Sequence, residues 1–295
     1  MTRSVIGLPG NEALTAGFAR DLGAELGSAE LRRFPDGETY ARIRSECAGR
    51  DVVLAATLHE PDNLLLPLVF LADAAREMGA ARVGLVAPYL AYMRQDARFQ
   101  PGEAVTSRSF ARLISSSFDW LVTVDPHLHR YRSLGELYTI PARVVHAAPL
   151  VAAWISDNVS DALLVGPDAE SEQWVADVAS RAGAPCVVLT KTRHGDHDVE
   201  VSLPDVDRWR GRTPVLVDDI ISTARTMIAT VGHLLRAGMK PPVCIGVHAV
   251  FAGHAFEELK VAGAGCVVTC DTVPHPTNGI SVAADLVHAV EDLSP

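Results

Sequence analysis

The stretch PVLVDDIISTARTMIATVGHLLRAGMKPPVCIGVHAVF, residues 214–251, contains two apolar runs with a helical pattern between them. The runs at 214–220 and 243–251 are apolar over most of their length, which is typical of strands whose two faces are both covered by helices. The helical pattern occupies residues 223–239, and Gly238 closes it. A strand, a helix and a strand in this order predict a parallel βαβ unit.

The same alternation runs along the rest of the chain. Strand-like runs are expected at residues 51–57, 82–90, 120–125, 162–168 and 185–193, and helical patterns at 63–80, 108–117 and 171–184. The sequence therefore predicts an α/β fold in which parallel sheets are flanked by helices.

The chain has 295 residues, which fits two domains of ordinary size. Prolines bracket a short strand in IPARVVHAAPL (140–150), so we place the boundary there, with domains at 1–145 and 146–295. Each half has one strand ending in proline and polar residues and another ending in aspartate. This favours a duplicated fold, although any two parallel α/β domains can share such features.

The composition narrows the classes of function. Hydrophobic residues make up 48% and charged residues 21%, a globular composition. A formal net charge of -10 argues against a general binder of nucleic acid or anionic membranes, which needs a basic face. No apolar run reaches a membrane-spanning length, and no signal peptide precedes the first strand. We therefore expect a cytoplasmic protein.

Five scattered cysteines without a C-x-x-C pair are typical of reduced core thiols. Zinc binding by Cys266 and Cys270 is the alternative.

The predicted strands carry a coherent set of polar residues at their ends, where ligands bind in open parallel sheets. Carboxylates and a histidine can hold a divalent metal or accept hydrogen bonds from sugar hydroxyls, and lysine and arginine neutralise phosphates. The set comprises Asp125, His127, Asp168, Lys191, Arg193, Asp218 and Asp219.

Hydroxyl side chains follow the paired acids Asp218 and Asp219. Ser222, Thr223 and Thr226 stand where the helix is expected to begin, and a helix start binds phosphate through its free N–H groups. Acids for hydroxyls and a helix start for phosphate together fit a molecule such as ribose 5-phosphate. A simple helix cap with solvated acids is the alternative that the residues leave open.

VLVDDIISTART (215–226) resembles the phosphoribosyl-pyrophosphate loop of type I phosphoribosyltransferases and of ribose-phosphate pyrophosphokinases. Further segments resemble the pyrophosphokinases and follow one another in the order of that family. They are RRFPDGETYARI (32–43), PYLAYMRQDARFQPGEAVTSRSFARLI (88–114), VTVDPHLHR (122–130), LLVGPDAES (163–171) and VVLTKTRHGDHDVEV (187–201). The chain is identified as resembling that family over nearly its whole length.

The resemblance implies two type-I-phosphoribosyltransferase-like domains, the first on the ATP side and the second binding ribose 5-phosphate. It implies that the diphosphoryl group of ATP passes to the anomeric hydroxyl of ribose 5-phosphate, with Mg²⁺ required. It also implies a homo-oligomer, a dimer or a hexamer-type assembly of dimers. In such an assembly the Phe-Pro-Asp-Gly-Glu loop reaches into a neighbour's ATP site.

On the ATP side, the resemblance implies that Phe34 stacks on adenine and that Asp36 and Glu38 bind its amino edge. For Phe34 the alternative is a buried core phenylalanine. For the two acids it is a Pro-Asp-Gly turn, and for them both interpretations can hold at once. Arg94, Gln95 and Asp96 are implied to hold ATP, where the alternative is a solvated loop of charges.

His127 and Asp168 are implied to be ligands of Mg²⁺. Histidine is an unusual ligand for that ion, so zinc held by His127 and His129 is a competing interpretation. His129 is otherwise expected to be structural.

Lys191 and Arg193 are implied to be catalytic, stabilising charge on the transferred group. The following stretch HGDHDVE (194–200) is expected to close on ATP, with an ordinary hairpin as the alternative. The ribose-5-phosphate site is implied to comprise Asp218, Asp219, Ser222, Thr223, Ala224, Arg225 and Thr226.

Several positions depart from the family's pattern. An acid is usual where Ser222 stands, and glycine where Arg225 stands. Pro126 replaces a leucine, and Glu170 and Glu172 replace glycines. These departures keep two alternatives open, a non-catalytic relative that binds nucleotide and a type I phosphoribosyltransferase.

Overall fold

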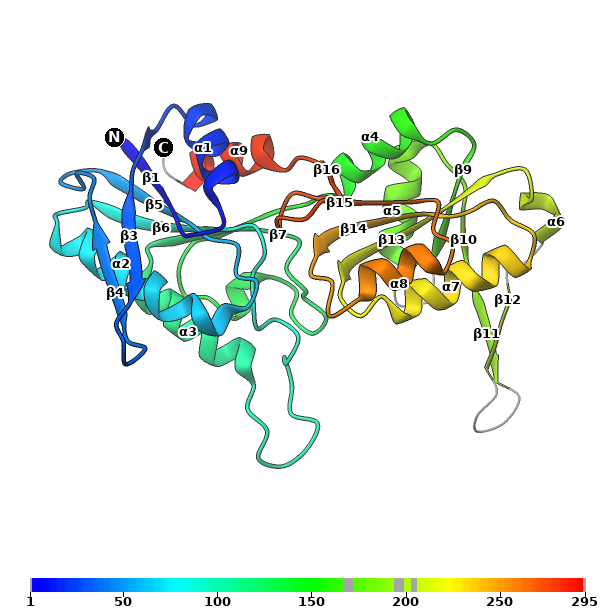
Figure 1. The fold of residues 1–295 in the computed structure, drawn as a ribbon, viewed down its shortest axis with the longest axis horizontal. Helices are drawn as coiled ribbons and strands as arrows, with labels where there is room; N and C mark the ends of the chain where they lie inside the picture. Colours follow the sequence, from blue (N-terminus) through cyan, green and yellow to red (C-terminus); the bar gives the residue numbers. More distant parts are fainter. Residues whose placement is uncertain (1, 167–171, 194–198, 203–205, 294–295) are drawn as a thin grey trace. The chain divides into compact units, whose positions relative to one another are not determined.

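The structure, a computed structural model, describes residues 2–166, 172–193, 199–202 and 206–293. The chain divides into two compact units (Figure 1). Unit 1 comprises Met1–Val145, Thr272–Pro274 and Val282–Pro295, and unit 2 comprises His146–Asp271 and His275–Ser281. Each unit is described separately below.

Unit 1 is a six-stranded parallel sheet with helices on both faces. Its strand order is β2-β1-β5-β6-β7-β8. The strands are β1 (Arg3–Gly7), β2 (Glu25–Leu26), β5 (Asp51–Ala55), β6 (Arg82–Ala87), β7 (Trp120–Val124) and β8 (Ala142–Val145). Helices α1 (Glu12–Asp21) and α9 (Ala283–Leu293) cover one face, and α2 (Leu65–Glu77) and α3 (Thr106–Ser117) cover the other.

Unit 2 has a second six-stranded parallel sheet, with the order β10-β9-β13-β14-β15-β16. The strands are β9 (Ala162–Gly166), β10 (Cys186–Val188), β13 (Thr213–Ile221), β14 (Val243–Ala249), β15 (Cys266–Cys270) and β16 (Asn278–Ile280). Its helices are α4 (Ala148–Asn158), α5 (Glu172–Ala182), the short α6 (Val206–Trp209), α7 (Arg225–Arg236) and α8 (Ala255–Val261).

The two sheets share one topology. In each, the second strand lies at an edge beside the first, and the third to sixth strands follow on the other side. Each unit also inserts an antiparallel pair between its second and third strands. The pairs are β3 (Ala29–Arg33) with β4 (Thr39–Ile43), and β11 (Thr190–Arg193) with β12 (Val199–Ser202). The common order and the common insertion support a duplicated fold.

The units exchange their last helices. α4 follows the last strand of unit 1 but packs on α5 in unit 2, whereas α9 follows the last strand of unit 2 but packs on α1, β7 and β8 in unit 1. The first stretch of unit 1 ends at Val145 and unit 2 begins at His146, as in the predicted division. The predicted division placed α9 in the second domain, whereas in the structure it belongs to unit 1. Its apolar residues Leu286 and Val290 are fully buried there, so the packing of that face determines where the helix belongs.

The core of unit 1 requires a glycine at one close approach. A Cβ atom at Gly84 in β6 would lie 1.9 Å from the ring of Trp120 in the adjacent strand β7. Trp120 is fully buried. Glycine at position 84 therefore makes room for the indole between the sheet and its covering helices.

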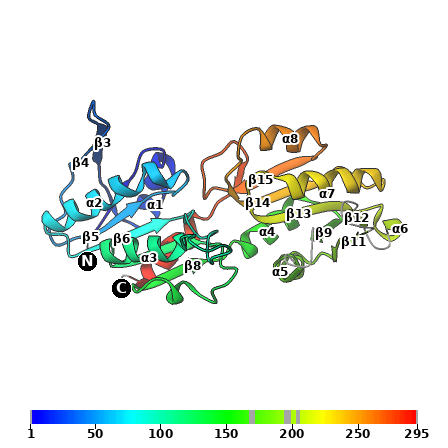
Figure 2. The same cartoon turned by 90° about the horizontal axis from the view of Figure 1, so that it is seen from below.

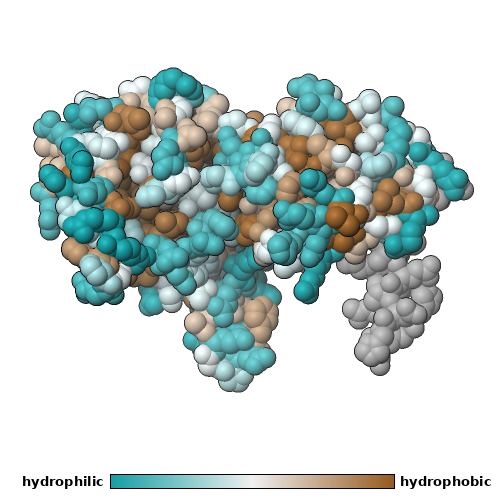
Figure 3. Space-filling model, in the orientation of Figure 1, coloured by the Kyte–Doolittle hydropathy of each residue, from teal (hydrophilic) through white to brown (hydrophobic). Residues whose placement is uncertain are grey.

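The α/β class with parallel sheets flanked by helices is confirmed, and two antiparallel pairs are added to it. No helix in the described part of the chain is long and apolar enough to span a membrane. On the face drawn in Figure 3, polar side chains interrupt the apolar patches. All five cysteines lie in the described part of the chain, and none of them forms a disulfide.

Candidate active site

The segment Phe34–Glu38 forms the turn of the β3–β4 pair. The backbone N–H of Phe34 donates to the carbonyl oxygen of Glu38 at 2.8 Å, and Gly37 has φ of 93°. The Asp36 carboxylate accepts a hydrogen bond from the N–H of Glu38 at 3.1 Å. The sequence alternative of a Pro-Asp-Gly turn therefore holds, and both acidic side chains stay exposed.

Phe34 lies at the surface of this pair, which stands away from the main sheet of unit 1 in Figure 2. Its side chain is 38% exposed, so the alternative of a buried core phenylalanine is wrong. The guanidinium carbon of Arg32 lies 4.7 Å from the ring centroid of Phe34, and the ring of Tyr40 meets it edge-on at 6.0 Å. These contacts hold an exposed aromatic ring in place, which is what stacking on a planar base requires.

The segment that carries Arg94, Gln95 and Asp96 leaves the carboxyl end of β6, and the segment that carries His127 leaves the adjacent β7. Arg94 is exposed and Gln95 is half-buried. The strand order thus brings to one edge of the sheet two segments that the sequence separates by about thirty residues.

Tyr92 holds the start of the first segment in a strained conformation. Its φ is 59°, in the left-handed region that a tyrosine rarely adopts. Its hydroxyl donates to the carboxylate of Asp62, and its ring lies 5.0 Å from that of Phe110. The hydrogen bond to Asp62 raises the pKa of Tyr92 to about 12. Strain held by specific contacts is typical of functional loops.

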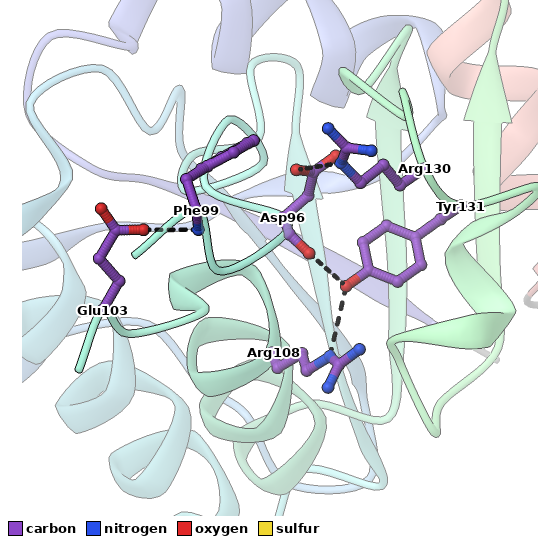
Figure 4. Close-up of polar contacts among 6 residues, drawn as sticks. All are labelled: Asp96, Phe99, Glu103, Arg108, Arg130 and Tyr131. Atoms are coloured by element: carbon purple, nitrogen blue, oxygen red, sulfur yellow. Dashed lines mark hydrogen bonds and ion pairs between the residues drawn. The ribbon is translucent and has the colours of Figure 1, made fainter. Parts of the chain in front are cut away.

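Asp96 differs from its neighbours because it is mostly buried. Its carboxylate accepts a hydrogen bond from Nε of Arg130 at 3.2 Å (Figure 4). The hydroxyl of Tyr131 donates to the carbonyl oxygen of Asp96 at 3.2 Å and accepts from Nε of Arg108 at 3.4 Å. Asp96 therefore connects its loop to the segment after β7. Of the two side chains in this ion pair, that of Arg130 is the one exposed to solvent.

An open groove of about 760 Å³ lies beside this network. It is lined by Arg98, Ala104, Val105, Arg108, Ser109, Arg112, Tyr131, Glu136 and Leu137. These arginines were not among the residues predicted from the sequence. The spacing of Arg108 and Arg112, one helical turn apart on α3, was the available signal.

His127 and His129 lie together, with ring centroids 3.9 Å apart. Asp125, which precedes them, has φ of 29°. Among the residues that the structure describes, no group of three histidine, cysteine or acidic side chains could hold a metal. The described residues therefore do not complete a zinc site around the two histidines, nor one around Cys266 and Cys270. Asp168 and Glu170 lie outside the described residues.

In unit 2, the paired acids lie within a strand and not at its tip. β13 extends to Ile221, and Asp218 pairs with Gly246 of β14. The two acids were expected at the strand end, and this is wrong because pairing with β14 continues past them; the predicted run of 214–220 stops one residue before Ile221. Both carboxylates are half-buried.

The loop Ser222–Ala224 joins β13 to α7. Ala224 has φ of 53°, and α7 begins at Arg225, two residues later than expected. The N–H groups of Phe251 and Ala252 donate to the carbonyl oxygens of Ile221 and Ser222 at 2.8 and 3.1 Å. The start of the loop is thus held from the end of the neighbouring strand.

Arg225 is exposed in the first turn of α7 and does not crowd the loop. A cation at a helix N-terminus opposes the helix dipole, which favours negative charge at that end. Arg225 and the helix N-terminus would both favour an anion at the loop.

Lys191 and Arg193 belong to β11, where they pair with Val201 and Val199 of β12. The two strands are antiparallel neighbours, as the hairpin alternative expects for the chain on either side of the loop. The loop at 194–198 lies outside the described residues.

Two families match the chain. The N-terminal domain of ribose phosphate pyrophosphokinase matches residues 4–117, and the phosphoribosyl transferase domain matches residues 133–285, more than half of the chain.

Curated relatives match over almost their whole length. A ribose-phosphate pyrophosphokinase of Methanopyrus kandleri is 37% identical over 94% of this chain and 94% of its own. Another, of Methanothermobacter thermautotrophicus, is 32% identical over 98% of this chain and 100% of its own.

The fold is also similar to the crystal structure of phosphoribosylpyrophosphate synthetase from Mycobacterium smegmatis. That match has a TM-score of 0.86 at 24% identity and covers 100% of both chains. At this identity the structural match supports the fold alone, whereas the relatives above 30% identity establish the family. The chain belongs to the ribose-phosphate pyrophosphokinase family.

Proposed function

We propose that this protein transfers the diphosphoryl group of ATP to the anomeric hydroxyl of ribose 5-phosphate, giving phosphoribosyl pyrophosphate and AMP. The observation that carries the proposal is the match to named pyrophosphokinases over both units, at 37% identity in one case. A phosphoribosyltransferase would not need an ATP site, whereas the segments 34–38 and 94–96 of this chain resemble those with which the pyrophosphokinases would bind ATP.

In the proposed reaction, the anomeric oxygen forms a bond to the β-phosphorus of ATP. The bond from that phosphorus to the oxygen shared with the α-phosphorus breaks, and AMP leaves with that oxygen. The anomeric hydroxyl gives its proton to water. Such transfers depend on alignment and on neutralising charge, so the protein's part is to bind, orient and supply cations.

Unit 1 would bind the nucleotide. The exposed ring of Phe34 offers a face for adenine, and the carboxylates of Asp36 and Glu38 can accept from its amino group. Arg94 would bind phosphate through a guanidinium that is always charged, with Gln95 beside it. Asp96 would act through Arg130, since its carboxylate is already paired.

Mg²⁺ fits this site as an ion that arrives with the nucleotide. It commonly keeps several waters and takes few protein ligands besides substrate phosphates, so a histidine and one carboxylate would be enough to hold it. His127 and Asp168 would hold it. When bound, it neutralises phosphate charge.

Unit 2 would bind the sugar phosphate. Asp218 and Asp219 can accept hydrogen bonds from ribose hydroxyls, while the loop Ser222–Ala224 and the start of α7 bind the 5-phosphate. Lys191 and Arg193 would stabilise the charge on the group in transfer.

We further propose that copies of the chain associate, so that the Phe34 turn serves a neighbour's nucleotide site. The turn stands away from its own sheet (Figure 2) and keeps its ring exposed.

The test is to mix purified protein with Mg-ATP and ribose 5-phosphate and to follow AMP and phosphoribosyl pyrophosphate. Equal amounts of the two products are expected. Absence of AMP with any divalent metal would replace the proposal with a non-catalytic, nucleotide-binding role.

Lys191→Ala is expected to leave thermal unfolding unchanged and to lower kcat by about a hundredfold or more, as removal of a transition-state charge partner does. Turnover equal to that of the unsubstituted protein would show that the β11–β12 pair has been misassigned.

A further inference from the structure

A cluster of three rings in unit 2 has no part in the reaction described above. Phe251 follows β14, Phe256 lies in α8, and His275 precedes β16. The ring of His275 lies 4.6 Å from that of Phe251 at an interplanar angle of 33°. Phe256 meets His275 edge-on at 5.1 Å and lies 5.4 Å from Phe251. We call these residues the His275 cluster.

Hydrogen bonds fix the orientation of the imidazole. The backbone N–H of Thr277 donates to Nδ1 of His275 at 3.3 Å, and the Thr277 hydroxyl lies 2.8 Å from the same nitrogen. An amide nitrogen can only donate, so Nδ1 is unprotonated and the Thr277 hydroxyl also donates to it.

The chain of hydrogen bonds continues in one direction. The side-chain amide of Asn278 donates to the Thr269 hydroxyl at 2.9 Å, and its Oδ1 accepts from the N–H of His275 at 2.9 Å. The Thr269 hydroxyl lies 2.8 Å from that of Thr277 and donates to it, since the Thr277 proton is already used. Every hydroxyl orientation thus depends on an acceptor at Nδ1.

The environment of His275 favours the neutral form of its ring. Burial lowers the pKa of His275, and the carboxylate of Glu257 opposes this effect. Lys260, on the same helix α8, places its ammonium 5.2 Å from the ring centroid of Phe256. Protonation of Nδ1 would break the bond from the Thr277 amide.

Phe251 connects this cluster to the loop that would bind phosphate. Its own N–H donates to the carbonyl oxygen of Ile221, the last residue of β13, at 2.8 Å. The next N–H, that of Ala252, donates to the carbonyl oxygen of Ser222 at 3.1 Å. The two bonds hold the point at which the chain leaves β13, so the backbone of Phe251 and Ala252 anchors the first residue of the loop.

We infer that His275 is a positioning residue for ribose 5-phosphate, with its imidazole orienting Phe251 and thereby the Ser222–Ala224 loop. The inference rests on the proposed function of that loop. His275 itself touches no substrate. Loss of its orienting contacts is expected to loosen the sugar phosphate while leaving the nucleotide unaffected.

Two substitutions separate the parts of the His275 side chain. His275→Phe keeps a ring against Phe251 and removes the acceptor, whereas His275→Asn keeps an acceptor close to the place of Nδ1 and removes the ring. Leu259→Val is the matched control, because Leu259 is fully buried in α8 and outside the cluster. It is expected to lower the melting temperature without changing the loop.

The measurements are the Kd for ribose 5-phosphate by calorimetry, KM for both substrates, kcat and the melting temperature. His275→Phe is expected to raise the Kd and KM for ribose 5-phosphate about tenfold, which corresponds to ~1.4 kcal/mol, with KM for ATP unchanged. His275→Asn is expected to fall between His275→Phe and the unsubstituted protein.

Equal sugar affinity in both His275 variants and the unsubstituted protein would overturn the inference. So would an equal loss of sugar affinity in Leu259→Val at the same melting temperature, since general destabilisation would then explain the effect. AMP production by the unsubstituted protein tests the proposed function separately. If the protein is inactive but still binds ribose 5-phosphate, the calorimetric comparison of the variants still decides the inference about His275. If it does not bind ribose 5-phosphate, both the proposed function and this inference are overturned.

Discussion

Replacing Arg130 tests whether Asp96 acts by anchoring its loop or by touching ATP. The Asp96 side chain is only 6% exposed, and its one ion-pair partner in the described part of the chain is Arg130, whose side chain is 56% exposed. Arg130→Gln leaves this carboxylate buried beside a neutral group. Loss of an anchor predicts reduced stability together with weaker ATP binding.

The magnitude follows from the exposure of the pair. A hydrogen bond to a charged group contributes about 1.5–3 kcal/mol to stability. Because water reaches the Arg130 side and screens the pair, we take a value around and below the lower end of this range, ~1–2 kcal/mol. For a unit of this size that lowers the melting temperature by about 2–8 °C. If ~1 kcal/mol of it holds the loop in its ATP-binding form, KM for ATP rises roughly fivefold.

The assay combines calorimetric unfolding with steady-state kinetics in a double-mutant cycle of Arg130→Gln and Asp96→Asn. The control is Arg132→Gln, which makes the same charge change two residues away at an exposed side chain. A coupling energy of ~1 kcal/mol is expected between positions 96 and 130. Additive effects on stability, with ATP affinity lost only in Asp96→Asn, would refute the anchoring argument and favour direct contact with ATP.

Three further outcomes are expected. Phe34→Ala raises KM for ATP and leaves that for ribose 5-phosphate unchanged, while Phe34→Trp retains affinity because a flat ring remains; the opposite pattern in substrate titrations would exclude adenine stacking. Deleting residues 282–295 unfolds unit 1, since burial of Leu286 and Val290 alone contributes ~3–6 kcal/mol; a cooperative unfolding transition of normal enthalpy in calorimetry would contradict this. Arg225→Ala raises the melting temperature slightly by removing a cation from a helix N-terminus, worth ~0.3–1 kcal/mol, yet weakens ribose 5-phosphate binding; unchanged calorimetric affinity would exclude Arg225 from the phosphate site.

Local patterns in the sequence were enough to predict strands β5, β6, β7, β9, β13 and β14, helices α2, α3, α5 and α7, and the α/β class. Apolar runs rich in β-branched residues, such as Val215–Val217, favour a strand inside a sheet covered on both faces, where burial removes them from water. The exact residue at which this strand ends could not be predicted from the apolar run. The acids Asp218 and Asp219 interrupt the apolar run, but backbone pairing with β14 extends the strand to Ile221.

Contacts between residues far apart in the chain also could not be predicted from the sequence. Asp96 and Arg130 are 34 positions apart, and they meet because β6 and β7 are neighbours in the sheet. The same holds for His275 and Phe251, which β14 and the segment before β16 bring together. From composition and spacing such residues can be recognised only as polar or aromatic, because neither property indicates which strands are neighbours in the sheet.

The sequence by itself determined the periodicity of the inner strands and their connecting helices, the chemistry available near the strand ends and the family to which the chain belongs. Only the tertiary structure decided that α9 completes unit 1, that Asp96 is anchored while Phe34 is exposed, and that β13 continues past its acids. The physical reason is that periodicity and propensity act between residues within a few positions, whereas burial and pairing depend on which surfaces remain to be covered once the elements have packed.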